Sequence, residues 1–247
     1  MNTNKNSYIF IYASVMVIIV AFLLAFVSSA LKPMQQKNVE LDKKKQVLAA
    51  LNIFEKDAEA AYNTYVKADQ LLNADGTVAA ENGGFAVENA AVSEAQLPLY
   101  VCEVEGATKY VLPLYGAGLW GPIWGYVALN ADKETIYGVY FSHASETPGL
   151  GAEITNRDKF QVPFIGKKAL NAAGDVVISV VKNGKVQNAE TEVDGISGGT
   201  ITSNGVDAML KNSIGLYKAF LTKKCDKGAC AAKAECAEQC QTEVVNQ

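Results

Sequence analysis

The feature that most constrains this chain is an uncharged, mostly apolar run that begins at Tyr8 and ends at Leu31. At a helical rise of ~1.5 Å per residue, such a run is long enough to cross a hydrocarbon core of ~30 Å. A cleaved signal peptide is the alternative, because Ser28-Ser29-Ala30 offers small residues at a cleavage position. The run is longer than the usual hydrophobic region of a signal peptide, and Lys5 is the only basic side chain before it. We therefore expect a retained, single-span membrane anchor.

Positive charges are unequally distributed on the two sides of this run. Lys32, Lys37 and the consecutive lysines 43–45 follow it. Counted literally, the positive-inside rule places the rest of the chain in the cytoplasm. Three consecutive lysines are, however, also typical of the solvated face of a helix, so the charge count alone leaves the orientation open.

The remainder of the chain has the length of one domain, roughly 190 residues before a distinct tail. We divide the chain into an anchor over 1–35, a soluble domain over 36–222 and a mobile, cysteine-containing tail over 223–247. Hydrophobic periodicity predicts a helix over 39–66, a loop region follows over 69–89, and Asn183-Gly184 predicts a hairpin turn. The fold class predicted is α+β, with mainly antiparallel strands flanked by helices. Strands are expected over 99–104, 109–115, 124–129, 135–142 and 176–181.

The segment Ser197-Gly198-Gly199-Thr200-Ile201-Thr202-Ser203 combines two glycines with four hydroxyl groups. Glycines let the backbone approach a bulky anion, and hydroxyls can donate to phosphate oxygens or form an ester. Apolar residues recur afterwards at helical spacing, so we expect Thr202 or Ser203 to be the N-cap of a helix whose N-terminus favours phosphate. The segment lacks the Gly-Lys-Ser/Thr ending of a Walker loop. A polar turn that opens a helix is the alternative.

Two further segments stand out by composition. Residues 114–129, which contain Trp120, are rich in glycine and aromatic residues, as in a hairpin whose rings pack in the core. Residues 143–151 follow as His143-Ala144-Ser145-Glu146-Thr147-Pro148-Gly149-Leu150-Gly151. His143 is the only histidine, which limits any His-pair metal site or Ser-His arrangement, and a hydrogen-bonded structural role is the simpler interpretation.

These segments resemble the covalent FMN-binding domain family. Residues 194–203 are similar to its flavinylation motif, in which a flavin transferase joins FMN through its phosphate to a threonine, here Thr200. Gly199 departs from the pattern, since family members usually carry Ala there, but the acceptor hydroxyl is kept. The sequence Glu146-Thr147-Pro148-Gly149-Leu150-Gly151 resembles a loop close to the flavin in the same family. Residues 118–129 resemble a stretch of its members that serve as C subunits in sodium-pumping NADH:quinone reductases.

The resemblance implies an electron-carrying FMN subunit of a complex that oxidises NADH, reduces quinone and exports Na⁺. Such a subunit is not active alone, and it has the other subunits and a flavin transferase as partners. It also implies the inner membrane of a bacterium with the soluble domain on the periplasmic side, against the literal charge count. Glu146 would orient its loop. Besides Thr200, the implied flavin site comprises Ser197, Gly198, Gly199, Thr202, Ser203, Glu146, Thr147, Leu150, Gly151 and Trp120.

Two alternatives stay open: the flavin subunit of a homologous ferredoxin:NAD⁺ oxidoreductase, and a non-redox, membrane-anchored binding module. We expect no catalytic side chain and no metal site, and the net charge of −4 argues against a nucleic-acid partner.

The cysteines fall into two groups. Cys102 lies in a predicted strand and is expected to be buried. The other four lie in the tail at spacings that fit neither the usual zinc patterns nor iron–sulfur patterns, and disulfides are chemically allowed there if the body is extracytoplasmic. They are Cys225, Cys230, Cys236 and Cys240.

Overall fold

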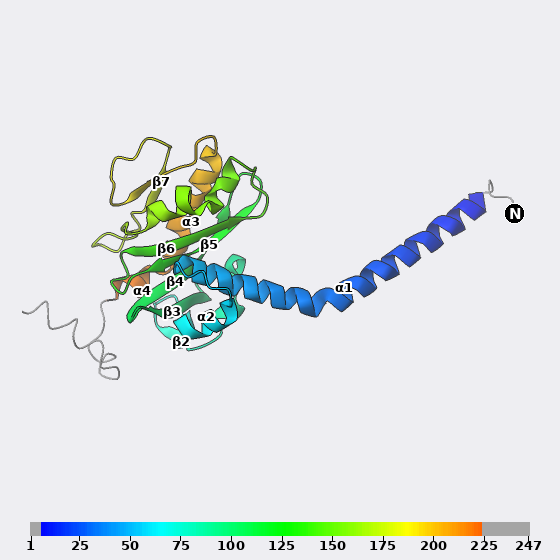
Figure 1. Cartoon of the computed structure of the whole chain (residues 1–247), viewed down its shortest axis with the longest axis horizontal. Coiled ribbons are helices and arrows are strands. Elements are labelled where there is room, and N and C mark those ends of the chain that lie inside the picture. Colours follow the sequence, from blue (N-terminus) through cyan, green and yellow to red (C-terminus); the bar gives the residue numbers. More distant parts are fainter. Residues whose placement is uncertain (1–5, 224–247) are drawn as a thin grey trace, which may run out of the picture. The chain divides into compact units, whose positions relative to one another are not determined.

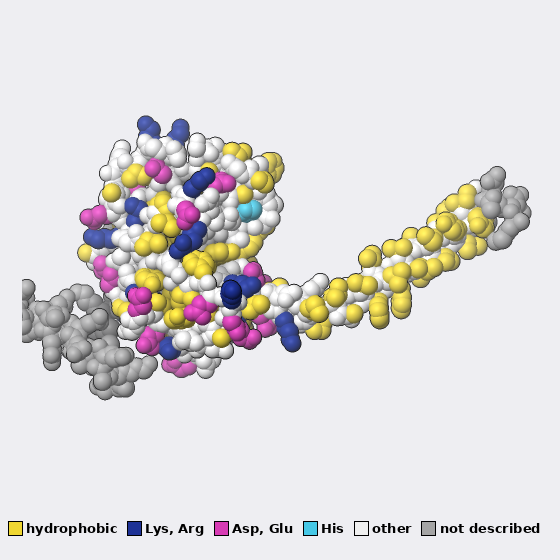
Figure 2. All heavy atoms as spheres, in the orientation of Figure 1, with side chains coloured by type: hydrophobic (Ala, Val, Ile, Leu, Met, Phe, Trp, Pro, Cys, Tyr) yellow, Lys and Arg dark blue, Asp and Glu magenta, His cyan; other side chains and the backbone are white. Residues whose placement is uncertain are grey.

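The computed structural model describes residues 6–223, and these fall into two packing units that divide between Lys44 and Lys45. The first unit is most of helix α1 (Asn6–Ala50), which contains Pro33. By length and composition α1 could span a membrane, a test that a signal sequence near an N-terminus would also meet. Figure 2 shows hydrophobic side chains along this helix, where they are exposed.

The second unit is built around a six-stranded, entirely antiparallel sheet in the order β2-β1-β3-β4-β5-β6 (Figure 1). A two-residue turn joins β3 to β4, and Glu105 and Gly106 both have positive φ there, as a type I′ hairpin requires. The sheet and its helices confirm the predicted α+β class. The strands are β1 (Val66–Leu72), β2 (Val78–Ala80), β3 (Leu97–Val104), β4 (Ala107–Ala117), β5 (Pro122–Leu129) and β6 (Ile136–His143).

Helical segments cover both faces of the sheet, so its central strands are buried on both sides (Figure 1). On one face, Met209 and Leu210 of α3 (Thr200–Leu216) pack with Leu112 and Leu114 of β4. On the other face lie the end of α1, α2 (Ala58–Tyr65) and Phe85. The remaining helical elements are α4 (Lys218–Thr222) and the short turns Gly84–Ala86, Asn89–Ala91, Gly151–Thr155, Arg157–Gln161 and Val162–Phe164.

The predicted helix over 39–66 is wrong as a single element. The helix that carries the apolar run continues to Ala50, and the chain then breaks, with Asn52 at a φ of 59°. Helix α2 begins after Asp57, whose Oδ1 accepts hydrogen bonds from the N–H groups of Glu59 and Ala60, both at 3.1 Å. The predicted loop over 69–89 is also wrong in part, because β1 ends and β2 lies inside it.

The hairpin predicted around Asn183-Gly184 is wrong as well. A turn is present, with Gly184 at a φ of 71°, but β7 (Ser179–Val181) and β8 (Glu192–Asp194) pair in parallel. The Gly184 N–H donates to Asp194 Oδ1 at 2.7 Å, so the turn is tied to β8 by a side chain and not by a strand ladder.

Cys102 is buried in β3 as predicted, and burial raises the pKa of its thiol to about 12. The predictions for Cys225, Cys230, Cys236 and Cys240 and for the tail lie outside the described residues.

Candidate functional site

Thr200 is exposed and is the first residue of α3, while the backbone of Gly199 is the N-cap. The predicted N-caps Thr202 and Ser203 are therefore wrong: both lie inside the first turn and are buried. Ser203 Oγ accepts the Ile196 N–H at 2.9 Å and donates to the Gly199 carbonyl at 2.9 Å. One buried hydroxyl thus fixes the loop that presents Thr200.

The N-terminus of α3 is suited to an anion. The N–H groups of Thr200, Ile201 and Thr202 have no acceptor within the helix, because an α-helix leaves its first N–H groups unsatisfied. No side chain caps the helix at Gly199. The helix dipole adds a partial positive charge at the same end. A phosphate group on the Thr200 hydroxyl would lie beside these donors.

Glu146 is the buried carboxylate of the site, with 4% of the residue exposed. Its Oε1 accepts the Trp120 N–H at 2.8 Å, and its Oε2 accepts the Thr202 hydroxyl at 2.5 Å. Its own N–H donates to His143 Nδ1 at 3.1 Å. Glu146 therefore connects the turn after β4, the loop after β6 and the first turn of α3.

The pKa of Glu146 is lowered from its ordinary value. Burial acts to raise the pKa, but hydrogen bonds from Thr202 and from the N–H groups of Trp120 and Leu119, together with His143, outweigh it. Glu146 is therefore ionised at neutral pH.

Two glycines allow the close approach of these segments. A Cβ on Gly118 would overlap Glu146 Oε1, and a Cβ on Gly151 would overlap Thr202 Oγ1. At Gly199 an added Cβ would lie 3.1 Å from Ile196 Cγ2, so the alanine usual in the family pattern would need only a small shift of Ile196.

A hollow of about 240 Å³ adjoins Thr200 and brings together most of the predicted site residues. Ser203 and Trp120 were predicted but do not line it: Ser203 is buried, and Trp120 is 66% exposed and contacts the lining residue Glu146 through its backbone N–H. Leu119 and Ile201 also line the hollow and were not predicted. Ile201 could have been found, because it lies off the apolar stripe that packs α3 on the sheet. The lining residues are Leu119, Glu146, Thr147, Leu150, Gly151, Gly198, Gly199, Thr200, Ile201 and Thr202.

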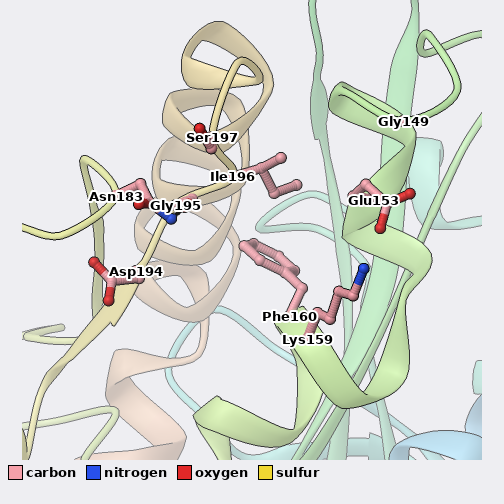
Figure 3. A pocket seen from close by; sticks show the side chains of 9 residues that line it. All are labelled: Gly149, Glu153, Lys159, Phe160, Asn183, Asp194, Gly195, Ile196 and Ser197. Carbon is pink, nitrogen blue, oxygen red and sulfur yellow. Dashed lines mark hydrogen bonds between the residues drawn. The ribbon is translucent and has the colours of Figure 1, made fainter.

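A second hollow of about 430 Å³ lies beside the first, and Ser197 lines this one instead (Figure 3). The two hollows are lined by consecutive residues. Gly149 and Ser197 line the second hollow. Their sequence neighbours Leu150 and Gly198 line the first. The side chains of Phe160 and Ile196 point toward each other in Figure 3. Among residues 6–223, no group of three side chains suited to a metal ion is found.

Comparison with known proteins places this site in a family. Residues 118–215, which include the three stretches 118–129, 146–151 and 194–203 that carry the resemblance, match the FMN-binding domain family. The C subunit of the Na⁺-translocating NADH-quinone reductase of Pasteurella multocida is 34% identical over 221 residues, covering 78% of this chain and 84% of that protein. The protein of the same name from Pseudomonas aeruginosa is 30% identical over 253 residues, covering 89% and 96%.

A solved structure agrees with these relatives. The crystal structure of the C subunit of the Na⁺-translocating NADH-quinone reductase from Parabacteroides distasonis is 45% identical, with a TM-score of 0.74, and the match covers 79% of this chain and 98% of that one. Given the shared fold, the FMN-binding domain match and relatives aligned over most of their length, this chain belongs to the family of Na⁺-translocating NADH-quinone reductase C subunits.

Proposed function

We propose that this chain carries FMN as a phosphoester on Thr200 and relays electrons within a membrane-bound, Na⁺-translocating NADH:quinone reductase. The observation that carries the proposal is the exposed hydroxyl of Thr200 at the N-terminus of α3, inside the matched FMN-binding domain. When bound, FMN supplies reversible electron transfer, and the protein supplies position and electrostatics.

The residues around Thr200 fit the two ends of FMN. The phosphoester is an anion, and it would accept hydrogen bonds from the first-turn N–H groups of α3. The isoalloxazine ring is flat and largely apolar, and the exposed side chains of Leu119, Trp120 and Leu150 offer apolar contacts beside the hollow. The hollow itself is smaller than FMN, so part of the flavin would remain at the surface, where an electron carrier must meet its partners.

The covalent bond requires an acceptor that another protein can reach. Thr200 is exposed, whereas the hydroxyls of Thr202 and Ser203 are buried and engaged in hydrogen bonds. A flavin transferase could therefore reach Thr200 without unfolding α3. The Thr200 oxygen would bond to the phosphorus of a flavin diphosphate donor as the P–O bond to the donor's second phosphate breaks, and that nucleotide phosphate would leave with the hydroxyl proton.

The relatives support a wider proposal about the context in which the chain works. We propose that the chain acts only with the other subunits of the reductase, is anchored in the bacterial inner membrane by α1 and holds its soluble domain on the periplasmic side. The relatives from Pasteurella multocida, Pseudomonas aeruginosa and Parabacteroides distasonis favour this complex over the ferredoxin:NAD⁺ oxidoreductase.

The test is the intact mass of the chain purified from its native membrane under denaturing conditions, with peptide mapping. We expect an added FMN, less one water, on the peptide that contains Thr200. Thr200→Ala should carry no covalent flavin and support no quinone reduction, whereas Thr200→Ser, which keeps a hydroxyl, should retain some flavin.

Ser197→Ala is the matched control, because Ser197 is an exposed hydroxyl in the same loop and its loss should leave the covalent flavin in place. An unmodified wild-type mass from a host with an active flavin transferase would favour the anchored binding module instead. Flavin retained by Thr200→Ala would place the linkage elsewhere.

A further inference from the structure

We propose that Glu146 is a positioning residue for the flavin site: its carboxylate locks the turn that bears Trp120 onto the first turn of α3. The effect on the flavin rests on the proposed function. The two hydrogen bonds of Glu146 that join these segments are present in the protein without flavin. Each oxygen of Glu146 accepts a hydrogen bond from a different segment. Oε1 accepts from the Trp120 N–H, and Oε2 accepts from the Thr202 hydroxyl.

The backbone of Trp120 is held from both sides although its side chain is exposed. Its N–H donates to Glu146 Oε1 at 2.8 Å, and its carbonyl accepts the Ser145 hydroxyl at 3.0 Å. Both partners come from the loop after β6. A backbone fixed in this way limits where the exposed indole can reach relative to Thr200, which favours an aromatic contact to a tethered ring.

The contacts of Glu146 are strongest with an ionised carboxylate. The groups that point at its oxygens are donors: the N–H of Trp120, the N–H of Leu119 and the hydroxyl of Thr202. A carboxylate accepts at both oxygens and carries a full negative charge, whereas a glutamine offers one neutral acceptor oxygen and an NH₂ group that can bond the Thr202 hydroxyl only if that hydroxyl turns to accept. The close approach at Gly118 and Gly151 leaves the carboxylate little room to shift.

The charge of Glu146 has a second effect. Glu146 lines the same hollow as Thr200, and its buried charge is screened less by salt than a surface charge. A nearby negative charge disfavours the addition of electrons to the flavin. With a flavin attached to Thr200, Glu146 would lower its reduction potential, in addition to holding the Trp120 turn and α3 together.

The first test uses hydrogen exchange on the full-length chain made without a flavin transferase. Glu146→Gln should speed exchange of the Trp120 N–H about tenfold, because the charged acceptor of its hydrogen bond is replaced by a weaker, neutral one. Glu153→Gln is the matched control: Glu153 lies on the same loop region and lines the second hollow, and its change should leave the Trp120 N–H protected.

The second test uses the flavinylated chain and measures the midpoint potential of its flavin. Glu146→Gln should raise the potential, while Glu153→Gln should change it less. Glu146→Asp separates the two effects, since it keeps the charge but shortens the reach. It should speed exchange at Trp120 and leave the potential closer to wild type. If Glu146→Gln does not fold, Glu146→Asp carries the exchange test alone.

Equal exchange of the Trp120 N–H in wild type, Glu146→Gln and Glu146→Asp would overturn the inference. A wild-type chain without covalent flavin would instead overturn the proposed function. The exchange test would still decide the role of Glu146, because it is made on the chain without flavin.

Discussion

Thr200 differs from the neighbouring hydroxyl residues in its surroundings rather than in its chemistry. Thr202 donates to Glu146, and Ser203 bridges Ile196 and Gly199, so both hydroxyls stabilise the loop from inside. Thr200 lies two residues before Thr202, at the first position of the helix, where it is exposed. Among the hydroxyls in the first turns of α3, burial therefore leaves Thr200 alone accessible as the proposed acceptor.

The sequence could predict these residues as a group but not their division of roles. The glycine and hydroxyl pattern located the loop, and the resemblance singled out Thr200. Neither could reveal that Glu146 reaches both Trp120 and Thr202, because that contact joins residues distant in the chain. Leu119 and Ile201 lie inside the quoted segments, but as apolar residues they carried no chemical signal that marked them as site residues.

The lowered pKa of Glu146 makes the lock sensitive to acid. Such a carboxyl has a lower pKa in the folded protein than in the unfolded one. It stabilises the fold fully at pH values above its unfolded-state pKa, and this contribution is lost as the pH falls through its folded-state pKa. We expect the difference in free energy of unfolding between wild type and Glu146→Gln to be constant near neutral pH and to shrink below about pH 4.5.

Urea unfolding at a series of pH values measures this difference, with Glu153→Gln as the reference variant. A difference that grows as the pH falls would contradict the expected sign.

At the scale of elements, local signals predicted the strands from β3 to β6 well. Each has alternating or continuous apolar residues and a short connection to the next. The sequence did not predict strand β1, because Lys67, Asp69 and Gln70 make this segment polar. It forms a strand through its antiparallel backbone pairing with β3. The sequence did not predict the parallel pair β7 and β8. Asn183-Gly184 indicates only that the chain turns locally, whereas the parallel pairing of the strands on either side depends on tertiary contacts.

Helix α3 offers a paired test of its packing. Gly205 lies against β4, and a Cβ there would overlap the Ala117 carbonyl oxygen, whereas a Cβ on Gly215 would meet nothing within 4 Å. Gly205→Ala should therefore destabilise the fold by ~1–3 kcal/mol, because α3 must move off the sheet. Gly215→Ala should stabilise it by up to ~1 kcal/mol, because alanine favours the helix.

Thermal or urea unfolding of the two variants measures both effects. Equal stabilities would show that α3 does not approach β4 this closely.

At the scale of the whole molecule, the end of α1 belongs to the folded body. Val47, Leu48 and Leu51 are buried, and the packing unit begins at Lys45. Removal of residues 1–44 should leave a folded domain that no longer sediments with membranes. Removal of residues 1–51 should cost ~5 kcal/mol or more, since each buried aliphatic side chain contributes ~1.5–3 kcal/mol, and this approaches the whole stability of a domain.

Circular dichroism and thermal unfolding of the two shortened chains test this expectation. Closely similar melting temperatures would mean that the last turns of α1 add little to the domain.

The late position of α3 in the sequence affects how the protein is made. All six strands of the sheet precede it, yet it covers β4 near the middle of that sheet. On the ribosome, the face that bears Leu112 and Leu114 is synthesised first and stays uncovered until α3 emerges, a period in which chaperones would protect it. Thr200 gains its folded setting only at that last step. The proposed modification therefore follows folding, and newly made chains pass through a flavin-free stage before they can join electron transfer.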